Sequence, residues 1–130
     1  MKLDLKPGIS YTASQVVVYE DTAAKYGSGL VEVFATPAMI ALMENAALKA
    51  VYTHLPEGFT TVGFELNVRH LKPTPIGMNV ECTATLKEVL GKKLVFHVVA
   101  HDEEGKIGEG THIRYIIDTR KFMKNYKPEK

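Results

Sequence analysis

Three side chains in the first part of the sequence could carry acid–base chemistry: Thr36, Glu44 and His70. Glu44 is the only acid between residues 36 and 55, in a segment whose other residues are mostly apolar. A desolvated carboxylate is suited to act as a base or a nucleophile near neutral pH. His70 would be a fitting partner, because a carboxylate can fix the tautomer of an imidazole and hold it as a proton carrier.

Each of these residues also has an ordinary structural explanation. Glu44 could be a helix surface residue, or an acid satisfied by backbone amides or by Arg69. A histidine on an apolar face is more often a satisfied core residue than a catalyst. Thr36 is a good helix N-cap, with Pro37 in the first helical position, where a missing N–H costs nothing. The start of a helix also offers unpaired N–H groups and a positive dipole end, which suit an oxyanion.

The segment from residue 36 to residue 55 is predicted to be one helix, and it is apolar around most of its circumference. We therefore expect the rest of the protein to wrap around it. About 12 Å of helix rise separates Thr36 from Glu44, so direct contact between them is not expected. A substrate carbonyl or the His70 ring would lie between them. The sequence thus predicts that Glu44 faces His70 across a pocket whose floor begins at Thr36.

His70 lies at the end of a stretch in which apolar and polar residues alternate. The apolar residues of this stretch, a strand predicted over residues 60–71, are Val62, Phe64, Leu66 and Val68. Side chains at alternate positions of a strand point to the same face of the sheet, and His70 continues this series. His70 is therefore predicted to point toward the helix.

The remaining sequence supplies four more strands. They are predicted over residues 11–20, 78–89, 93–102 and 106–118, with a loop or short helical turn over residues 21–30. Short links between the last four strands favour an antiparallel meander, and the helix is the only element that can cover its apolar face. The predicted fold class is α+β, a curved antiparallel five-stranded sheet wrapped around one long central helix, which is called a hotdog fold.

Length and composition bound the organisation of the chain. Its 130 residues, 45% of them apolar, fit a single domain over residues 1–130, with about residues 120–130 as a flexible tail. This tail carries Lys121, Lys124, Lys127 and Lys130. A protomer of this size leaves apolar surface at its edge uncovered, so we expect a homodimer. Further pairing of dimers into a tetramer stays open.

The same numbers exclude several classes of protein. A net charge of +1 gives no general attraction to nucleic acid or to an anionic membrane. No segment approaches the roughly 18 apolar residues of a membrane span, and the start lacks the apolar run of a secretory signal. The single cysteine, Cys82, permits no internal disulfide and falls on the apolar face of its strand. We therefore expect a cytoplasmic protein with Cys82 packed in its core.

The other histidines and the strand glycines give weaker signals. His97, His101 and His112 lie on predicted strands, and no two histidines are spaced as helical metal ligands, so no metal is expected. Gly108 and Gly110 do not open a helix, so they do not form a phosphate loop. Glycines inside a strand instead mark a bulge or a close approach of another part of the chain.

Several short segments match the joint spacing of a known family over about residues 8–122. They are Val33-Phe34-Ala35-Thr36, Leu42-Met43-Glu44, Val68-Arg69-His70, Pro73-Thr74-Pro75-Ile76-Gly77, Ala100-His101-Asp102 and Gly108-Glu109-Gly110-Thr111-His112-Ile113-Arg114. In this pattern the chain resembles the fluoroacetyl-CoA thioesterase family of hotdog proteins. The resemblance implies that Thr36, Glu44 and His70 are catalytic and that Gly63 and Arg114 contact the substrate.

The resemblance also implies the reaction, the hydrolysis of an acyl-CoA thioester to a free acid and CoA. Glu44 would attack the carbonyl or activate water, His70 would move protons, and Thr36 would polarise the carbonyl oxygen. No metal or bound organic cofactor is implied, since CoA is part of the substrate. Three lysines near turns are candidates for contacts to the CoA phosphates: Lys72, Lys92 and Lys93.

One stretch departs from the family. The fluoroacetyl-specific enzyme carries phenylalanines that form a lid before the Phe-Ala-Thr segment, and here Gly27 and Leu30 stand in their places. We therefore expect Leu30 to contact a short-chain acyl group that is not specifically fluoroacetyl. Two alternatives stay open: an acyl-CoA binding or sensing module with little turnover, and an enoyl-CoA hydratase.

Overall fold

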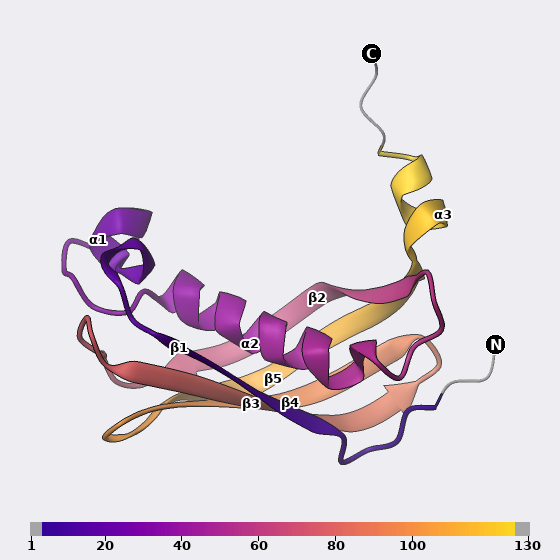
Figure 1. The fold of residues 1–130 in the computed structure, drawn as a ribbon, viewed down its shortest axis with the longest axis horizontal. Coiled ribbons are helices and arrows are strands. Elements are labelled where there is room, and N and C mark those ends of the chain that lie inside the picture. Colours follow the sequence, from indigo (N-terminus) through magenta and orange to yellow (C-terminus); the bar gives the residue numbers. More distant parts are fainter. Residues whose placement is uncertain (1–3, 127–130) are drawn as a thin grey trace.

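The long helix lies on one face of a five-stranded antiparallel sheet (Figure 1). The computed structural model describes residues 4–126. In chain order its elements are β1 (Ser10–Val16), a 3-10 helix (Tyr19–Asp21), α1 (Ala23–Tyr26), α2 (Thr36–Tyr52), β2 (Phe59–His70), β3 (Asn79–Leu90), β4 (Lys93–Asp102), β5 (Gly105–Asp118) and α3 (Thr119–Lys124). The order of helix and strands is as predicted, although β1 ends at Val16 rather than at Glu20.

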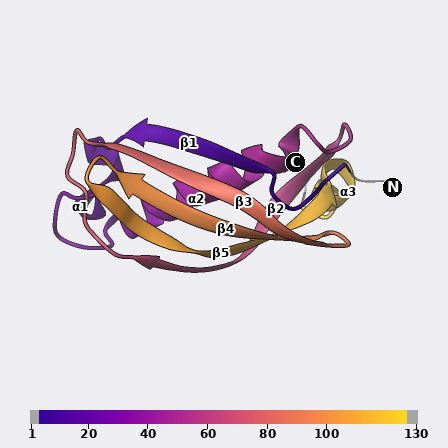
Figure 2. The same cartoon turned by 90° about the horizontal axis from the view of Figure 1, so that it is seen from below.

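The strand order β1-β3-β4-β5-β2 differs from the predicted meander of four strands (Figure 2). β3, β4 and β5 do form a meander, but β2 pairs with β5 instead of β3, and β1 takes the place beside β3. The link over residues 71–78 therefore crosses two strands. Backbone bonds hold it there: Phe34 N–H donates to the carbonyl of Thr74, and Gly77 N–H donates to the carbonyl of Val17.

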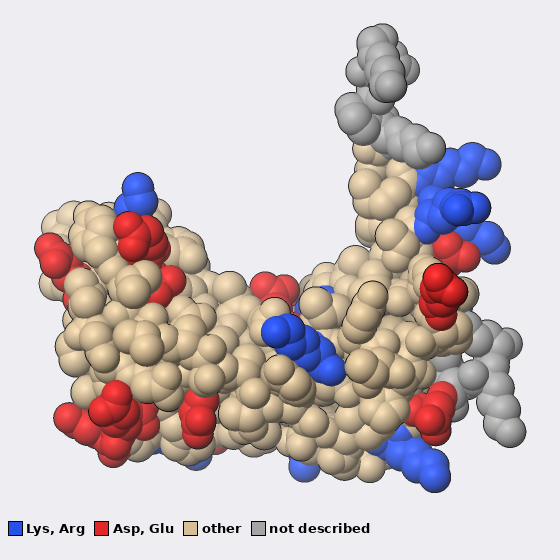
Figure 3. Space-filling model, viewed as in Figure 1, with Lys and Arg blue, Asp and Glu red and all other residues tan. Residues whose placement is uncertain are grey.

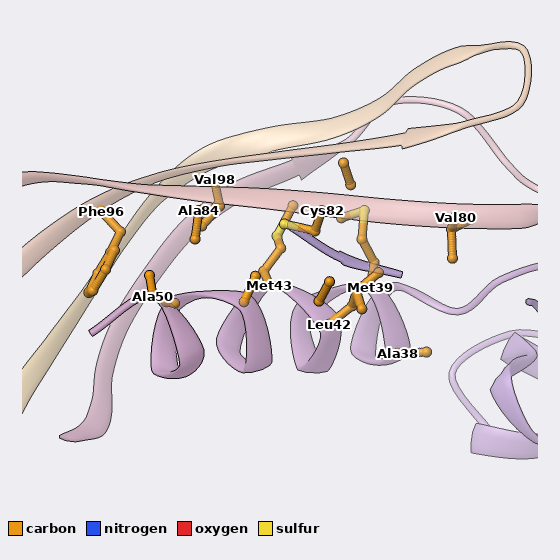
Figure 4. Close-up of a cluster of buried hydrophobic side chains, with 14 of the residues drawn as sticks. Ala38, Met39, Leu42, Met43, Ala50, Val80, Cys82, Ala84, Phe96 and Val98 are labelled. Atoms are coloured by element: carbon orange, nitrogen blue, oxygen red, sulfur yellow. The ribbon is translucent and has the colours of Figure 1, made fainter. Parts of the chain in front are cut away.

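The core lies between α2 and the inner face of the sheet (Figure 4). Alternate residues of β3 and β4 are fully buried: Val80, Cys82, Ala84, Leu86, Leu94, Phe96, Val98 and Ala100. They pack against small or flexible residues of α2: Ala38, Met39, Leu42, Met43, Ala46, Ala47 and Ala50. The predicted core position of Cys82 is confirmed, and burial raises the pKa of its thiol to about 12.

Two glycines of β5, Gly108 and Gly110, mark close approaches, as predicted. A Cβ atom on Gly108 would lie 2.5 Å from Sδ of Met39, so the missing side chain lets α2 approach the sheet. A Cβ atom on Gly110 would collide with the backbone of Asn67 and Val68 on the neighbouring strand. Both positions therefore exclude any larger residue without a shift of the backbone or of the helix.

A β-bulge in β2 makes part of the predicted strand parity wrong. Gly63 is opposite Arg114 and Glu65 is opposite Ile113, so Phe64 is an extra residue between them. The bulge reverses which side chains face α2, because the side-chain period of a strand is two. Phe64, which was predicted to face the helix, is 65% exposed. Thr61 is buried, although its neighbour Val62 was predicted to take the inward position.

After the bulge the predicted parity holds. Leu66 is opposite the buried His112, and His70 is opposite Gly108, beside which Met39 of α2 packs. His70 therefore points to the helix side of the sheet, as predicted. The prediction was right for this residue because the bulge lies earlier in the strand.

The start of α2 differs from the prediction by one residue. Ala35 is the N-cap and makes no side-chain cap bond, so Thr36 is the first helical residue and Pro37 the second. The hydroxyl of Thr36 has a different partner, His70. A threonine that does not cap its own helix is free for other interactions, and here the side chain joins two elements that are distant in sequence.

Only one side of α2 is covered within this chain, although the sequence predicts a helix wrapped on most sides. Residues on its outer side are exposed, including Ala41, Lys49 and Tyr52, the last with 57% of its surface accessible. The helix thus carries more apolar residues than its own sheet covers. The end of α2 at Tyr52, before the predicted Leu55, leaves this exposed tyrosine in the last turn.

Part of the predicted flexible tail forms the short helix α3, which stands away from the sheet (Figure 1). Lys121 and Lys124 are exposed on it, on a segment where basic side chains gather (Figure 3). Lys127 and Lys130 lie outside the described residues. Within residues 4–126 no helix is both long and apolar enough to cross a membrane.

The carboxylate of Asp102 anchors the link that follows His70. Its Oδ2 accepts hydrogen bonds from Lys72 Nζ and Thr74 Oγ1, both at 2.8 Å. Its Oδ1 accepts from the N–H groups of Glu104 and Gly105. Burial alone would raise the pKa of Asp102, but these hydrogen bonds outweigh burial and lower it. The anchor therefore holds the β2–β3 link against the β4–β5 turn.

We expect Asp102→Ala to lower the free energy of unfolding by about 2–3 kcal/mol, because it leaves buried donors without an acceptor. Urea unfolding followed by circular dichroism measures this change. Glu104→Ala is the matched control: Glu104 also approaches Lys72, at 3.6 Å, but its side chain is 68% exposed. A surface pair of this kind is worth less than about 1 kcal/mol. Equal effects of the two substitutions would contradict the anchoring role.

Candidate active site

Thr36 and His70 form the first cluster of predicted site residues, here called the hydroxyl–imidazole pair. Oγ1 of Thr36, in the first turn of α2, lies 2.7 Å from Nδ1 of His70, at the end of β2. The other ring nitrogen, Nε2, is buried and has no hydrogen-bond partner within residues 4–126. Burial lowers the pKa of His70, which favours the neutral ring. The pair thus combines a hydroxyl with an imidazole that has one nitrogen left for proton transfer.

A cavity of about 310 Å³ opens beside this pair. Its walls come from α1, the loop before α2 and the β2–β3 link: Ala23, Ser28, Val33, Phe34, Ala35, Thr36, His70, Leu71, Lys72 and Pro73. The volume lies at the lower end of the range for small-molecule sites. The first N–H groups of α2 have no acceptor within the helix, so the cavity also adjoins a natural site for negative charge.

Glu44, Gly63 and Arg114 form the second cluster, here called the acid cluster. Oε2 of Glu44, in the middle of α2, lies 3.9 Å from Nη1 of Arg114 on β5. Gly63 is the residue opposite Arg114 in the register of β2 and β5. A Cβ atom on Gly63 would lie 2.7 Å from Oε2 of Glu44, so only glycine leaves the carboxylate in its place.

The two charges of the acid cluster have different surroundings. The Arg114 side chain is 7% exposed, whereas the Glu44 side chain is 41% exposed. Burial lowers the pKa of Arg114, and the nearby charge of Glu44 opposes this effect. Glu44 is thus half-exposed in this chain and faces a buried cation, rather than being enclosed by apolar side chains.

Thr61 and His112 hold the guanidinium of Arg114, and neither was among the predicted site residues. Nε donates to Oγ1 of Thr61 at 2.7 Å, Nη2 donates to the carbonyl of Thr61 at 2.9 Å, and Nη1 lies 3.2 Å from Nε2 of His112. The bulge in β2 concealed Thr61, which was expected on the outer face. His112 had a signal in the sequence: it lies two residues before Arg114 on one strand, so their side chains share a face.

The two clusters do not touch within one chain. They are separated by the stretch of β5 that runs from Gly108, the residue opposite His70, to Arg114. At about 3.3 Å per residue, this stretch is about 20 Å long. Among the described residues, no ion pair joins Glu44 to His70. The charged partner of Glu44 is instead Arg114. The predicted arrangement of Glu44 facing His70 is therefore not found inside a single subunit.

Two further residues considered for substrate contact lie outside both clusters. Leu30 is 98% exposed and does not line the cavity beside the hydroxyl–imidazole pair. Lys72 does line this cavity, but its ammonium group is bonded to Asp102 at 2.8 Å. Lys72 thus already has an anionic partner in this chain. A substrate contact for Leu30 stays a prediction.

We expect the free energy of unfolding to fall as the pH is lowered through about 6.5, the ordinary pKa of histidine. Burial lowers the pKa of both His70 and His112 in the folded protein. The unfolded chain therefore binds more protons at acid pH, so stability present above about pH 6.5 is lost below it. The slope is at most about 1.4 kcal/mol per pH unit for each histidine.

Urea unfolding between about pH 7.5 and 5.5 measures this slope. The double variant His70→Gln/His112→Gln has no imidazole at either position and should show a flatter dependence. An unchanged slope in the double variant would show that other groups cause the effect.

Comparison with known proteins links the chain to a family by sequence. A family model described as fluoroacetyl-CoA-specific thioesterase matches residues 17–120. The fluoroacetyl-CoA thioesterase of Streptantibioticus cattleyicolor is 43% identical over 91 residues, which are 70% of this chain and 66% of that protein. The aligned stretch thus spans just under two thirds of this relative's length.

Solved structures agree with this match. A variant of the fluoroacetyl-CoA-specific thioesterase FlK superposes with a TM-score of 0.88 at 35% identity, over 95% of this chain and 96% of that chain. Another FlK variant, in complex with acetyl-CoA, has a TM-score of 0.88 at 34% identity, over 95% and 100% of the two chains. A Thermus thermophilus protein described as a thioesterase superfamily member has a TM-score of 0.86 at 29% identity, over 93% and 90%.

These matches confirm the predicted hotdog fold and the resemblance on which the site residues were assigned. They extend over both clusters, since the matched residues 17–120 include every member of the hydroxyl–imidazole pair and the acid cluster. The chain therefore belongs to the fluoroacetyl-CoA-specific thioesterase family.

Proposed function

We propose that this protein hydrolyses short-chain acyl-CoA thioesters to the free acid and CoA. The observation that carries the proposal is the hydrogen bond between Thr36 and His70, at the helix start and beside a cavity. Such a site can receive a thioester carbonyl and exchange a proton with its sulfur. Family membership supports the same reaction. The proposed steps use side chains, backbone N–H groups and water, and CoA enters as part of the substrate.

The separation of the two clusters supports a homodimer with shared sites. β2 is an edge strand of 12 residues, and the backbone on its free side is open to pairing with another strand. The exposed Phe64 lies on this same strand. Closed two-fold symmetry is the commonest way for a soluble protein to cover such an edge.

A two-fold axis across β2 would also complete the site. With the axis near Leu66 and Asn67, antiparallel pairing sets Gly63 of one strand beside His70 of the partner subunit. The acid cluster of one protomer would then approach the hydroxyl–imidazole pair of the other. Each dimer would contain two such sites, and neither would be complete in an isolated protomer.

In the proposed mechanism the thioester carbonyl lies at the start of α2. The Thr36 hydroxyl and the first N–H groups of the helix donate hydrogen bonds to the oxygen as it gains negative charge. Glu44 either takes a proton from the attacking water or attacks the carbonyl carbon itself, giving an anhydride that water opens. His70 passes the proton that the water loses on to the departing sulfur and ends neutral, as it began, so the products are the carboxylic acid and the CoA thiol.

The proposed acyl group is short and not specifically fluoroacetyl. Gly27 ends α1 in the left-handed region, with φ of 78°, and has no side chain to cover the cavity. Leu30 points into solvent in this chain, so neither Gly27 nor Leu30 supplies an aromatic ring at the positions that the resemblance gives to the lid. We place the reaction in the cytoplasm, since the single cysteine is a free, buried thiol, which fits a reducing compartment.

Thiol release from a panel of short acyl-CoA and enoyl-CoA species tests the proposed reaction. We expect Glu44→Gln and His70→Ala each to lower kcat/KM by about 10²-fold or more, because each removes a proton-transfer group. Glu88→Gln, an exposed acid on β3, is the matched control and should retain the wild-type rate. Saturable binding by the wild type without thiol release would favour a binding module. Loss of the enoyl absorbance without thiol release would favour a hydratase.

Mixing two inactive variants tests the shared site. In a heterodimer of Glu44→Gln and His70→Ala, one site carries both substitutions and the other carries neither. Random exchange of subunits should therefore restore about a quarter of the wild-type rate. If each subunit held a complete site of its own, the mixture would stay inactive. Size-exclusion chromatography with light scattering checks that dimers form and exchange under these conditions.

A further inference from the structure

The guanidinium of Arg114 is a buried cation held mainly by neutral acceptors. Thr61 accepts two of its hydrogen bonds and His112 accepts one. The nearest carboxylate, that of Glu44, is 3.9 Å away, which is too far for a hydrogen bond. The orientation of this cation therefore depends on the residues that accept from it, because no tight ion pair fixes it.

Within residues 4–126, two of the five N–H groups of Arg114 have no acceptor, since Thr61 and His112 use three. One of the two belongs to Nη1. This atom lies nearest to Glu44 and 3.6 Å from the position that a Cβ atom on Gly63 would occupy. An acyl group lying beside Gly63 would therefore meet the part of the guanidinium whose hydrogen bonding is incomplete.

His112 can hold Arg114 in only one neutral tautomer. Its ring is fully buried, and Nδ1 lies 2.9 Å from the carbonyl oxygen of Glu65, so Nδ1 must carry the proton and donate it. Nε2 is then bare and accepts from Nη1 of Arg114. The other tautomer would set two N–H groups against each other and a bare nitrogen against a carbonyl oxygen.

A second proton on His112 would remove this acceptor and add a cation beside the guanidinium. The groups that face the ring come from four elements: Arg114 on β5, Glu44 on α2, the carbonyl of Glu65 on β2 and the ring of Phe96 on β4. Burial lowers the pKa of His112, and the charge of Arg114 lowers it further, against the opposing effects of Glu65 and Glu44. The neutral ring is thus favoured at neutral pH.

We propose that His112 is a positioning residue for substrate binding: its bare Nε2 sets the rotation of Arg114 so that Nη1 faces the acyl group beside Gly63. This inference rests on the proposed thioesterase function, and His112 itself does not touch the substrate. Removal of the acceptor, by substitution or by protonation, lets the guanidinium turn toward Glu44. The contact between Arg114 and the acyl group is made in both the ground state and the transition state. Its weakening therefore raises KM more than it lowers kcat.

Nitrogen NMR of the histidine side chains tests the tautomer without any activity. In a long-range ¹⁵N–¹H spectrum of the wild-type protein, assigned with His112→Gln, we expect the Nδ1–H form of His112 at neutral pH. We also expect this form to persist as the pH is lowered below the ordinary histidine value of about 6.5. The Nε2–H form, or a doubly protonated ring at neutral pH, would overturn the proposal.

Kinetics of the folded variants test the positioning role. His112→Leu removes the acceptor, and we expect KM for the best acyl-CoA substrate to rise about tenfold with a smaller change in kcat. His112→Gln keeps a side-chain oxygen acceptor at a similar reach and should recover most of this loss. The matched control, His97→Leu, changes a histidine of β4 that lies opposite Thr111, outside both clusters. A loss of kcat alone, or no recovery with glutamine, would show a merely structural role.

A double-mutant cycle separates an effect through Arg114 from any other. In an Arg114→Met background, His112→Leu should raise KM no further, because the group that it positions is gone. Additive increases would overturn the proposal. If the wild type hydrolyses no thioester, the proposed function fails, while the NMR measurement still decides whether His112 holds Arg114 in the stated tautomer.

Discussion

Antiparallel pairing between β2 and β5 positions both clusters of the candidate site, and the bulge at Phe64 decides which side chains of β2 face α2. Before the bulge, Thr61 and Gly63 face the helix and meet Arg114. After it, the strand presents His70 on the same face. A regular strand would turn one of the two groups outward, because the side-chain period of a strand is two. One extra residue thus lets a single strand serve the hydroxyl–imidazole pair at one end and the acid cluster at the other.

The helix α2 sets the spacing of the site. It is a rigid rod that presents Thr36 in its first turn and Glu44 about 12 Å further along. Gly108 lets the helix lie close to the sheet, since any side chain there would meet Met39. The same rigidity keeps Glu44 away from His70 within one chain. The site therefore consists of two well-ordered parts, and the open edge of β2 offers the most direct way to bring them together.

The acid cluster shows how a buried cation can be kept ready for a ligand. A close ion pair with Glu44 would satisfy Arg114 and occupy the carboxylate, whereas the observed 3.9 Å leaves both groups free for further bonds. Thr61 and His112 offset the cost of burying the guanidinium by accepting from it without adding charge. Arg114 can thus be fixed in direction while part of its hydrogen-bonding capacity stays unused.

Elements with a strong period were predictable from the sequence: the helix, the strand over residues 93–102 and the core position of Cys82 follow from local patterns. The types of Thr36, Glu44 and His70 also indicated the chemistry. The bulge, the placement of β2 beside β5 and the partners of Arg114 depended on contacts between residues far apart in the chain, which no local pattern encodes. The sequence by itself determined the elements and the reactive groups, because these follow from side-chain type and period. Only the tertiary structure decided which groups meet, because strand register and bulges are set by pairing across the sheet.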